Sequence, residues 1–345
     1  MENKEIVIFM PSIEKGGVEK NLFIVANYLS NKFKKVSLVT ADKIKTNYSN
    51  KSSNIFSQNS IIYSKRNRIL KSIIASFYLI KKIFISKKII ILSFQSNIWA
   101  IIISILFNVK IIVRSNSSSE IWAKNYIKRK IFSFCFKYAN KIIVNSAELK
   151  REFKKKFHIN SDLIYNPLNK KEIIAKSKKK PHKKIFLSSK KVLKILNIGR
   201  ITEQKNQILI LKAIKLLKNR FKLEVIIMGN GKLKKDLLDF ITLNNLEKII
   251  KIKDFKKNPY QAIKEADLFI LSSIYEGLPN VLLEAIVLRK PIISSDCPTG
   301  PKEILKEGKL GILFKNNNFL DLASKIRKFL KNREMYEKKT LIAYK

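Results

Sequence analysis

The chain has 345 residues, which suits two domains of ordinary size, and its content of 46% hydrophobic and 28% charged residues excludes a disordered or fibrous protein. Its two cysteines, Cys135 and Cys297, lie too far apart for a disulfide framework or a cysteine zinc site, and they suit a reducing compartment. The formal charge of +45 favours an anionic partner, but it does not distinguish nucleic acid, membrane and phosphate-bearing substrates, and part of it fits a compositional bias toward lysine.

Short apolar segments alternate with longer amphipathic segments in the first half of the chain, and the N-terminus runs into the first strand without a signal peptide. Strands are predicted at Ile6–Met10, Lys35–Thr40, Ile89–Phe94, Val109–Arg114 and Lys141–Asn145. Helices are predicted between them at Gly17–Ser30, Arg66–Ser86, Asn97–Phe107 and Ile121–Ala139. Runs of β-branched residues are typical of parallel strands covered on both faces, so this half predicts a doubly wound sheet.

One uncharged segment, Ile89–Val109, is long enough to cross a bilayer. Polar residues interrupt it at Ser93, Gln95, Ser96 and Asn97. A buried strand followed by a helix that is capped near Ser96 or Asn97 explains the same pattern, and we favour that interpretation.

The pattern breaks near Asn166–Pro167, and residues 169–191, which are rich in Lys and Ser, are interpreted as a linker. Strands are then predicted at Leu193–Ile198, Leu223–Met228, Ile249–Lys253, Leu268–Leu271 and Pro291–Ser294, and helices at Asn206–Leu217, Lys232–Asn244, Pro259–Glu265, Val281–Leu288 and Leu320–Tyr336. The sequence therefore predicts an α/β fold of two Rossmann-like domains with doubly wound parallel sheets, residues 1–168 and 192–345. Ligands are expected in a cleft that faces the carboxyl ends of both sheets.

Two glycine turns lie between a predicted strand and the helix that follows it. Gly16 and Gly17 follow the first strand, and Gly229 and Gly231 follow the strand Leu223–Met228. Glycine lets backbone N–H groups approach an anion at the start of a helix, but an ordinary tight turn explains either pair equally well.

Two basic side chains lie in the loop after the strand Leu193–Ile198. Gly199 is followed by Arg200, and Lys205 stands five positions further on. A guanidinium and an ammonium at the carboxyl end of a parallel strand can converge on one diphosphate, so we predict phosphate binding here.

The segment after the strand Leu268–Leu271 carries the strongest signal for a ligand. Glu276 ends the strand, and Gly277, Leu278, Pro279 and Asn280 lead into a helix that carries Glu284. The free N–H groups of this turn can bind an anion or sugar hydroxyls, and Pro279 suits the first helical turn. Two acidic residues beside an anion-binding turn fit a nucleotide sugar, which has hydroxyls at both ends and phosphates between them.

With these residues in place, the chain resembles the retaining GT-B glycosyltransferases of family 4. The pair Glu276 and Glu284 matches the paired-glutamate motif of that family. Further matches occur, in the expected order, at Gly16-Gly17-Val18-Glu19, Arg114-Ser115-Asn116, Val144-Asn145-Ser146, Ile164-Tyr165-Asn166-Pro167, Gly199-Arg200, Lys205-Asn206 and Gly229–Gly231. The region Glu276–Ile304 is most similar to enzymes that build lipopolysaccharide, capsule or lipid-linked oligosaccharide.

The resemblance implies a role for each matching residue. Arg200 and Lys205 would hold the donor diphosphate and stabilise the leaving nucleotide, Glu276 would bind the transferred sugar, and Glu284 the ribose. Gly16, Gly17, Gly199, Gly229, Gly231 and residues 277–280 would complete the donor site. The donor is expected to be a UDP-sugar, with HexNAc as the sugar, and no metal or other cofactor is expected.

The first domain departs from the family in one respect, because many relatives carry a histidine near the reacting sugar. Only His158 and His182 occur in this chain; His158 ends a lysine-rich helix and His182 lies in the predicted linker. Glu19, Arg114 and Asn116 are therefore the candidate residues on the acceptor side, for a glycan or lipid-linked acceptor.

Two segments of the first domain interleave basic and apolar or aromatic residues, Arg66–Lys88 and Trp122–Lys141. This pattern suits an anionic membrane surface, although core-facing stripes with solvated lysines explain it nearly as well. We expect a peripheral enzyme on the cytoplasmic face of the inner membrane.

Other functions were weighed against this interpretation. A nucleic-acid-binding protein would need stacking platforms or a recognition helix, and none is evident, so no specific nucleic-acid binding is expected. The alternatives that stay open are a different GT-B enzyme, such as a sugar-nucleotide epimerase, and a basic protein that binds nucleic acid without specificity. The four intact cleft segments argue against an inactive binding protein.

Overall fold

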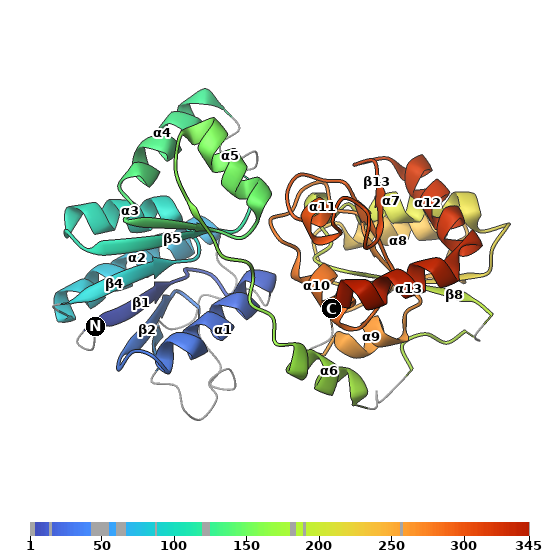
Figure 1. The fold of residues 1–345 in the computed structure, drawn as a ribbon, viewed down its shortest axis with the longest axis horizontal. Coiled ribbons are helices and arrows are strands. Elements are labelled where there is room, and N and C mark those ends of the chain that lie inside the picture. The colour runs from blue at the N-terminus through green and yellow to red at the C-terminus, as the bar shows by residue number, and fades with distance from the viewer. Residues whose placement is uncertain are drawn as a thin grey trace. The chain divides into compact units, whose positions relative to one another are not determined.

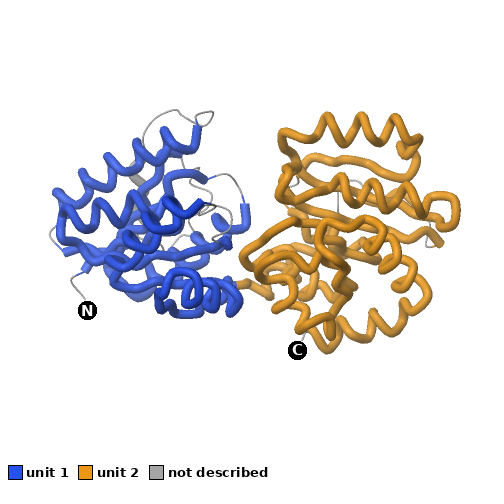
Figure 2. The backbone as a smooth tube through the Cα atoms, turned by 90° about the horizontal axis from the view of Figure 1, so that it is seen from above, with its two compact units in different colours: residues 1–167 blue, residues 168–345 orange. Residues whose placement is uncertain are grey.

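The computed structural model describes residues 4–13, 16–42, 55–59, 67–86, 88–118, 125–179, 184–188, 191–255 and 258–344. Contacts within the chain divide it into two compact units, Met1–Pro167 and Leu168–Lys345 (Figure 2). Each unit is built on one parallel sheet flanked by helices, which confirms the predicted fold class (Figure 1).

The first unit contains a seven-stranded sheet in the order β3-β2-β1-β4-β5-β6-β7. Its strands are β1 (Glu5–Phe9), β2 (Val36–Thr40), β3 (Ile55–Asn59), β4 (Ile89–Ser93), β5 (Lys110–Ser115), β6 (Lys141–Val144) and β7 (Asp162–Leu163). Its helices are α1 (Gly17–Ser30), α2 (Arg68–Ile85), α3 (Asn97–Leu106), α4 (Tyr126–Lys137) and α5 (Ala147–Phe157). Ile8 packs in the core with α1, whereas Val7 and Phe9 pack in the core with α2 to α5 on the opposite face.

The uncharged segment that could have been a membrane span forms β4 and then α3, as predicted. Ser96 is the N-cap of α3, but its hydroxyl contacts the Ser72 hydroxyl at 2.7 Å and does not cap the helix. Its backbone instead adopts a left-handed conformation with φ of 54°. Within the part of the chain that the structure describes, no helix combines the length and the apolar character needed to cross a membrane.

The second unit contains a six-stranded sheet in the order β10-β9-β8-β11-β12-β13. Its strands are β8 (Leu193–Ile198), β9 (Leu223–Met228), β10 (Ile250–Lys253), β11 (Leu268–Leu271), β12 (Ile292–Ser295) and β13 (Ile312–Phe314). Its helices are α6 (Lys170–Lys178), α7 (Gln207–Leu217), α8 (Lys234–Leu243), α9 (Tyr260–Glu265), α10 (Asn280–Val287), α11 (Pro301–Ile304), α12 (Phe319–Lys331) and α13 (Arg333–Tyr344), with a short 3-10 turn, η2 (Glu203–Lys205). Ile195 and Leu196 of β8 belong to cores on opposite faces, with α7, α8 and α12 on one and α6, α9 and α10 on the other.

The segment predicted as a linker, residues 169–191, is instead part of the second unit. Residues 170–178 form α6, which packs against α9 and α10. Ile185 and Phe186 are buried in the same core, and both of their N–H groups donate to the Glu265 carboxylate. Because lysines dominate the composition, the sequence pattern did not indicate that these few apolar residues are buried. Their burial anchors the segment in the second unit. His182 lies outside the described residues.

Three further details differ from the prediction. Helix α4 begins at Tyr126, and residues 119–124, which include the predicted start of that helix and Trp122, lie outside the described part of the chain. Helices α12 and α13 replace one predicted terminal helix, with Asn332 between them. Helix α5 was predicted only as a lysine-rich helix that ends at His158, without a start; it begins after Ser146, which caps it by accepting a hydrogen bond from the Leu149 N–H.

Candidate functional site

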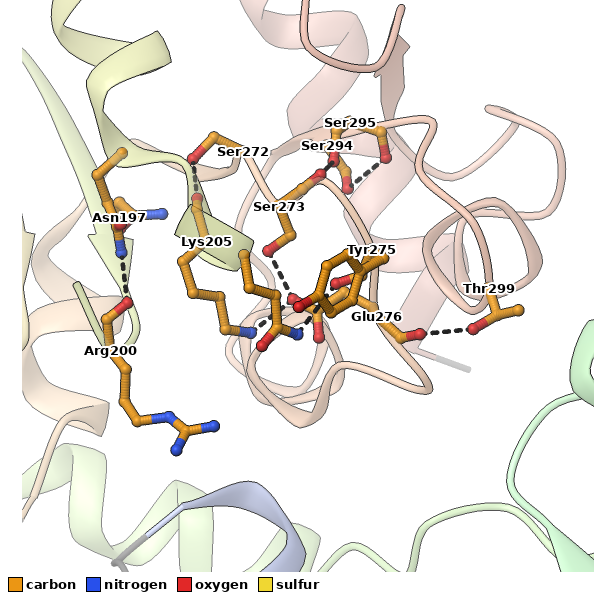
Figure 3. A network of polar contacts seen from close by, with 12 residues as sticks. Asn197, Arg200, Lys205, Ser272, Ser273, Tyr275, Glu276, Ser294, Ser295 and Thr299 are labelled. Carbon is orange, nitrogen blue, oxygen red and sulfur yellow. Dashed lines mark hydrogen bonds and ion pairs between the residues drawn. The ribbon is translucent and has the colours of Figure 1, made fainter. Parts of the chain in front are cut away.

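Two loops of the second unit meet at the carboxyl edge of its sheet. Strands β8 and β11 are neighbours, so the loop after β8 lies against the loop after β11. The Ser272 hydroxyl donates to the Lys205 carbonyl at 2.8 Å, and the Ile274 N–H donates to the Gln204 carbonyl at 2.8 Å. The Gln204 side-chain amide in turn donates to the Tyr275 carbonyl at 3.1 Å. These bonds fix the backbone on which the predicted Lys205 and Glu276 side chains stand (Figure 3).

Lys205 and Glu276 form an ion pair at the centre of this loop pair. The Lys205 ammonium lies 2.5 Å from Oε1 of Glu276, and their side chains are 15% and 8% exposed. The Ser273 hydroxyl donates to the same oxygen at 2.6 Å. The other carboxylate oxygen, Oε2, accepts no hydrogen bond from a residue that the structure describes. The Glu276 carboxylate is therefore held in place, with one oxygen left for a further donor.

The backbone of Glu276 is held as firmly as its side chain. Its N–H donates to the Pro298 carbonyl at 3.0 Å, and the Thr299 hydroxyl donates to its carbonyl at 2.6 Å. The predictions did not include Ser273 and Thr299 as site residues. Ser273 stands three positions before Glu276 in the same motif, which was the available signal, whereas Thr299 reaches the site only through the fold.

Cys297 is buried close to the ion pair. Burial first, and then the negative charge of Glu276, raise the pKa of the Cys297 thiol to about 12. The residue is thus an uncharged thiol at neutral pH and offers no thiolate nucleophile.

Arg200 is not part of the ion-pair network. Its side chain is exposed, and its guanidinium lies apart from the Glu276 carboxylate (Figure 3). Its carbonyl accepts a hydrogen bond from the Gln207 side chain at 3.0 Å, which fixes the backbone while the long side chain extends from it. The predicted convergence of Arg200 and Lys205 on one diphosphate stays a prediction.

The glycines after β8 and β9 pack against each other's backbone. A methyl group on Gly229 would lie 1.8 Å from the Gly199 carbonyl oxygen, and one on Gly231 would lie 2.0 Å from the Ile201 carbonyl oxygen. The Ile201 N–H also donates to the Asn230 carbonyl at 2.9 Å. This close approach accounts for both glycines without a ligand.

The turn from Gly277 to Asn280 leads directly into α10. Pro279 is the N-cap of α10, with no side-chain cap. It therefore lies just before the first helical turn in which it was predicted. Gly300, at a φ of +92°, packs against this turn, where a methyl group would lie 2.2 Å from the Gly277 carbonyl oxygen. Leu278 is buried in the turn.

Glu284 lies on α10 with only 5% of its surface exposed. It is hydrogen-bonded to Tyr260 of α9, and burial together with the charges of Glu284 and Glu172 raises the pKa of the tyrosine hydroxyl. The two glutamates of the motif therefore have different surroundings: Glu276 is paired with a lysine, and Glu284 with a tyrosine.

Comparison with known proteins identifies the unit that carries this site. Residues 178–345 match the family described as glycosyl transferases group 1. The second unit is a group 1 glycosyltransferase domain.

Two relatives agree with this assignment. An uncharacterized glycosyltransferase of Methanocaldococcus jannaschii is 32% identical over 225 residues, which cover 60% of this chain and 55% of that protein. An N-acetylgalactosamine-N,N'-diacetylbacillosaminyl-diphospho-undecaprenol 4-alpha-N-acetylgalactosaminyltransferase of Campylobacter jejuni is 28% identical over 195 residues, which cover 56% of this chain and 51% of that enzyme. The chain thus spans little more than half the length of these relatives.

The fold extends the likeness beyond the group 1 domain. Alr3699/HepE of Anabaena, solved in complex with UDP, superimposes with a TM-score of 0.76 at 16% identity, covering 99% of this chain and 93% of that one. Together with the two parallel sheets, this shows the GT-B fold.

The unit that precedes the group 1 domain contains the other predicted residues. The Gly16 N–H donates to the Glu19 carboxylate at 2.8 Å, and Glu19 is buried at the start of α1. The Glu19 carboxylate therefore accepts the hydrogen bond of the Gly16 N–H group, which was predicted to bind a phosphate. Gly17 is the first residue of α1.

Arg114 and Asn116 lie together at the end of β5. Nε of Arg114 donates to Oδ1 of Asn116 at 3.1 Å, and the Asn116 amide donates to the Phe94 carbonyl at 3.2 Å. Across the residues with described positions, no three His, Cys, Asp or Glu side chains form a group that could hold a metal ion. His158 is an exposed residue at the end of α5.

Proposed function

We propose that the chain is a retaining glycosyltransferase that moves a sugar from a nucleotide-sugar donor to a glycan or lipid-linked acceptor in surface polysaccharide synthesis. The observation that carries the proposal is the Lys205–Glu276 pair in a group 1 glycosyltransferase domain. It provides a cation and a carboxylate side by side at the carboxyl edge of the sheet, where ligands bind in this architecture.

The cation acts on the leaving group. When the bond between the sugar anomeric carbon and the diphosphate breaks, negative charge develops on the diphosphate oxygen. The Lys205 ammonium keeps two further N–H groups beyond the one directed at Glu276, and these can stabilise that charge. The exposed side chain of Arg200 is extended, so its guanidinium can reach the same diphosphate from the other end of the loop.

The carboxylate acts on the sugar. Oε2 of Glu276 accepts a hydrogen bond from a hydroxyl of the transferred residue, and its fixed backbone sets the orientation of the ring. The acceptor oxygen forms the new bond on the face that the diphosphate leaves, and its proton passes to the leaving phosphate. No side-chain nucleophile and no metal enter this scheme.

For the donor we propose a UDP-sugar carrying a HexNAc residue. UDP is the nucleotide in the Anabaena structure, and the Campylobacter relative is named for transfer of N-acetylgalactosamine. Glu284 and its Tyr260 partner, on the helix that follows the Glu276 turn, are the candidate ribose contacts. The glycines at positions 199, 229, 231 and 277 and the neighbouring Leu278, Pro279 and Asn280 shape the turns around the nucleotide.

We further propose that the enzyme docks on an anionic membrane surface, at its cytoplasmic face. The sequence contains no acidic residue between Asp42 and Glu120 or between Glu120 and Glu148. Helices α2, α3 and α4 pack side by side and present exposed apolar side chains: Ile69, Ile73, Phe77, Phe84, Ile85, Trp99, Ile102, Ile105, Leu106, Tyr126, Ile127, Ile131, Phe134 and Tyr138. Exposed basic residues stand among them, and each contributes about 1 kcal/mol near anionic lipid.

Turnover of labelled UDP-sugars by the full chain tests the proposed reaction. We expect release of UDP from one UDP-HexNAc, and a loss of about 100-fold or more in Lys205→Ala and Glu276→Gln, because each removes a group that acts in the transition state. Lys215→Ala is the matched control, since Lys215 is an exposed lysine on the neighbouring helix α7. Equal turnover by the parent and both site variants would reject the assignment of the site.

A further inference from the structure

Arg114 is a buried cation that pairs with no carboxylate of the residues that the structure describes. It is 3% exposed, at the end of β5 in the first unit. Lys71 and Lys82 are equally buried, and each pairs with a carboxylate: Lys71 lies 2.8 Å from Asp42, and Lys82 lies 2.7 Å from Glu5. No such ion pair is present for Arg114 in the described portion of the chain. A buried charge is costly unless something pairs with it.

The hydrogen bonds of Arg114 all go to neutral oxygens. Nε donates to the Asn116 side chain at 3.1 Å, and Nη2 donates to the Ile164 carbonyl at 3.3 Å and to the Asn166 side chain at 2.9 Å. Three of its five N–H groups are thus used. The two on Nη1 have no partner among the residues that the structure places. Burial lowers the pKa of Arg114 to about 10, so the guanidinium keeps its charge at neutral pH.

A buried acceptor atom without a partner belongs to the same hydrogen-bonded cluster. Asn145, at the end of β6, is 2% exposed, and its amide donates to the Asn116 carbonyl at 3.5 Å. Its Oδ1 is buried and has no hydrogen-bond partner in the described structure. Buried polar atoms of this kind are rare in folded proteins and call for an explanation. Asn116 links this acceptor atom to the guanidinium, because it contacts both Arg114 and Asn145.

We propose that Arg114, Asn116 and Asn145 form a subsite for an oxyanion, a phosphate or a carboxylate, and that the acceptor substrate carries it. The Nη1 group donates two hydrogen bonds to the oxyanion, and Oδ1 of Asn145 accepts one from a neighbouring hydroxyl. Assigning this oxyanion to the acceptor rests on the proposed function. The subsite itself rests only on the geometry at the carboxyl ends of β5 and β6.

Arginine Nε–H signals in a nuclear magnetic resonance titration test the subsite directly. The full chain is labelled at arginine and saturated with UDP, so that the donor site is occupied, and sodium phosphate or glucuronate is added. The Arg114 signal is identified by its loss in Arg114→Lys. We expect it to shift in a saturable way, and the anion that saturates at lower concentration shows which oxyanion the subsite prefers.

The signal of Arg129, an exposed residue of α4, reports nonspecific anion binding to this basic chain. An Arg114 shift no larger than that of Arg129, with either anion, would show that Arg114 only braces residues 164–166 and would overturn the proposal. The titration itself follows the unmodified side chain, and only the assignment of its signal uses the Arg114→Lys variant.

Asn166→Asp provides the second test. The substitution keeps the shape of the side chain and places a carboxylate oxygen where Oδ1 now lies 2.9 Å from Nη2. We expect phosphate or glucuronate to bind Arg114 at least tenfold more weakly, because the cation then has an internal partner. Unchanged affinity would count against the subsite. If the parent turned over no UDP-sugar but its Arg114 signal still responded, the proposed reaction would fail while the subsite stood.

Discussion

At the residue scale, the glycines around the proposed donor site serve the packing of the loops. Gly229 allows the Gly199 carbonyl to approach where a Cβ would otherwise stand, and this contact holds the ends of β8 and β9 together. Gly199 is different, because a methyl group there would meet Lys205 at an ordinary contact distance of 3.5 Å. The backbone packing thus requires glycine at position 229 but not at position 199.

This difference predicts unequal effects of two alanine substitutions. Gly229→Ala forces the backbone apart and should cost about 3 kcal/mol of unfolding free energy or more, whereas Gly199→Ala should cost less than about 1 kcal/mol. Chemical denaturation of both variants measures the two costs. Equal stability of the two variants would contradict the role of Gly229 as a packing residue.

The sequence predicted Lys205 and Glu276 as site residues but not their ion pair. Each follows a buried apolar run, which marks the carboxyl end of a strand. The pair is 71 positions apart in the chain and forms only because β8 and β11 are neighbours in the sheet, with β9 and β10 on the far side of β8. The contact of Gly16 with Glu19 was equally hidden, because a glycine pair before a helix suits both a phosphate and a glutamate cap.

At the element scale, helices α2, α3 and α4 carry two surfaces. Their buried residues, such as Leu79, Ile101 and Phe136, pack on the sheet, and the apolar residues on their other side remain exposed. A soluble surface seldom carries so many exposed large apolar side chains on adjacent helices without a partner. The basic residues among these apolar side chains favour an anionic partner.

Vesicle sedimentation tests this surface. The full chain should pellet with anionic vesicles at low salt, stay in solution with neutral vesicles, and be released at high salt. The variant Ile127→Ser/Lys128→Gln/Phe134→Ser on α4 should bind clearly more weakly, because it removes apolar area and charge together. A matched variant on α7, Lys215→Gln/Leu216→Ser, should bind as the parent does. Loss of binding in both variants alike, or in neither, would argue against this face.

Strands and helices with a clear apolar pattern could be predicted from the sequence. Segments with few apolar residues could not. Runs such as Leu223–Met228 define a buried strand by themselves, and the observed β9 has the predicted bounds. The segment 169–191 failed because its lysines dominate the composition, while Ile173, Ile185 and Phe186 reach a core formed by distant parts of the chain. Where burial depends on a few residues and long-range contacts, local composition gives the wrong answer.

At the scale of the whole molecule, two sheets of the same plan each bring polar side chains to their carboxyl edges. In the second unit these side chains form an internal ion pair, whereas in the first they surround a cation, Arg114, that has no counter-charge among the described residues. A chain with a formal charge of +45 offers many lysines to any phosphate. Specific binding is therefore recognised by its dependence on single residues.

We propose that Lys205 holds the diphosphate of the donor, and calorimetric titration of UDP into the full chain measures this contact. Lys205→Ala should weaken UDP binding about 10-fold to 100-fold, since a charge-assisted hydrogen bond contributes about 1.5–3 kcal/mol. Glu276→Gln should bind UDP nearly as well as the parent, because its proposed contact is with the sugar, and Lys215→Ala should be indistinguishable from the parent. Undiminished UDP affinity in Lys205→Ala would contradict the account.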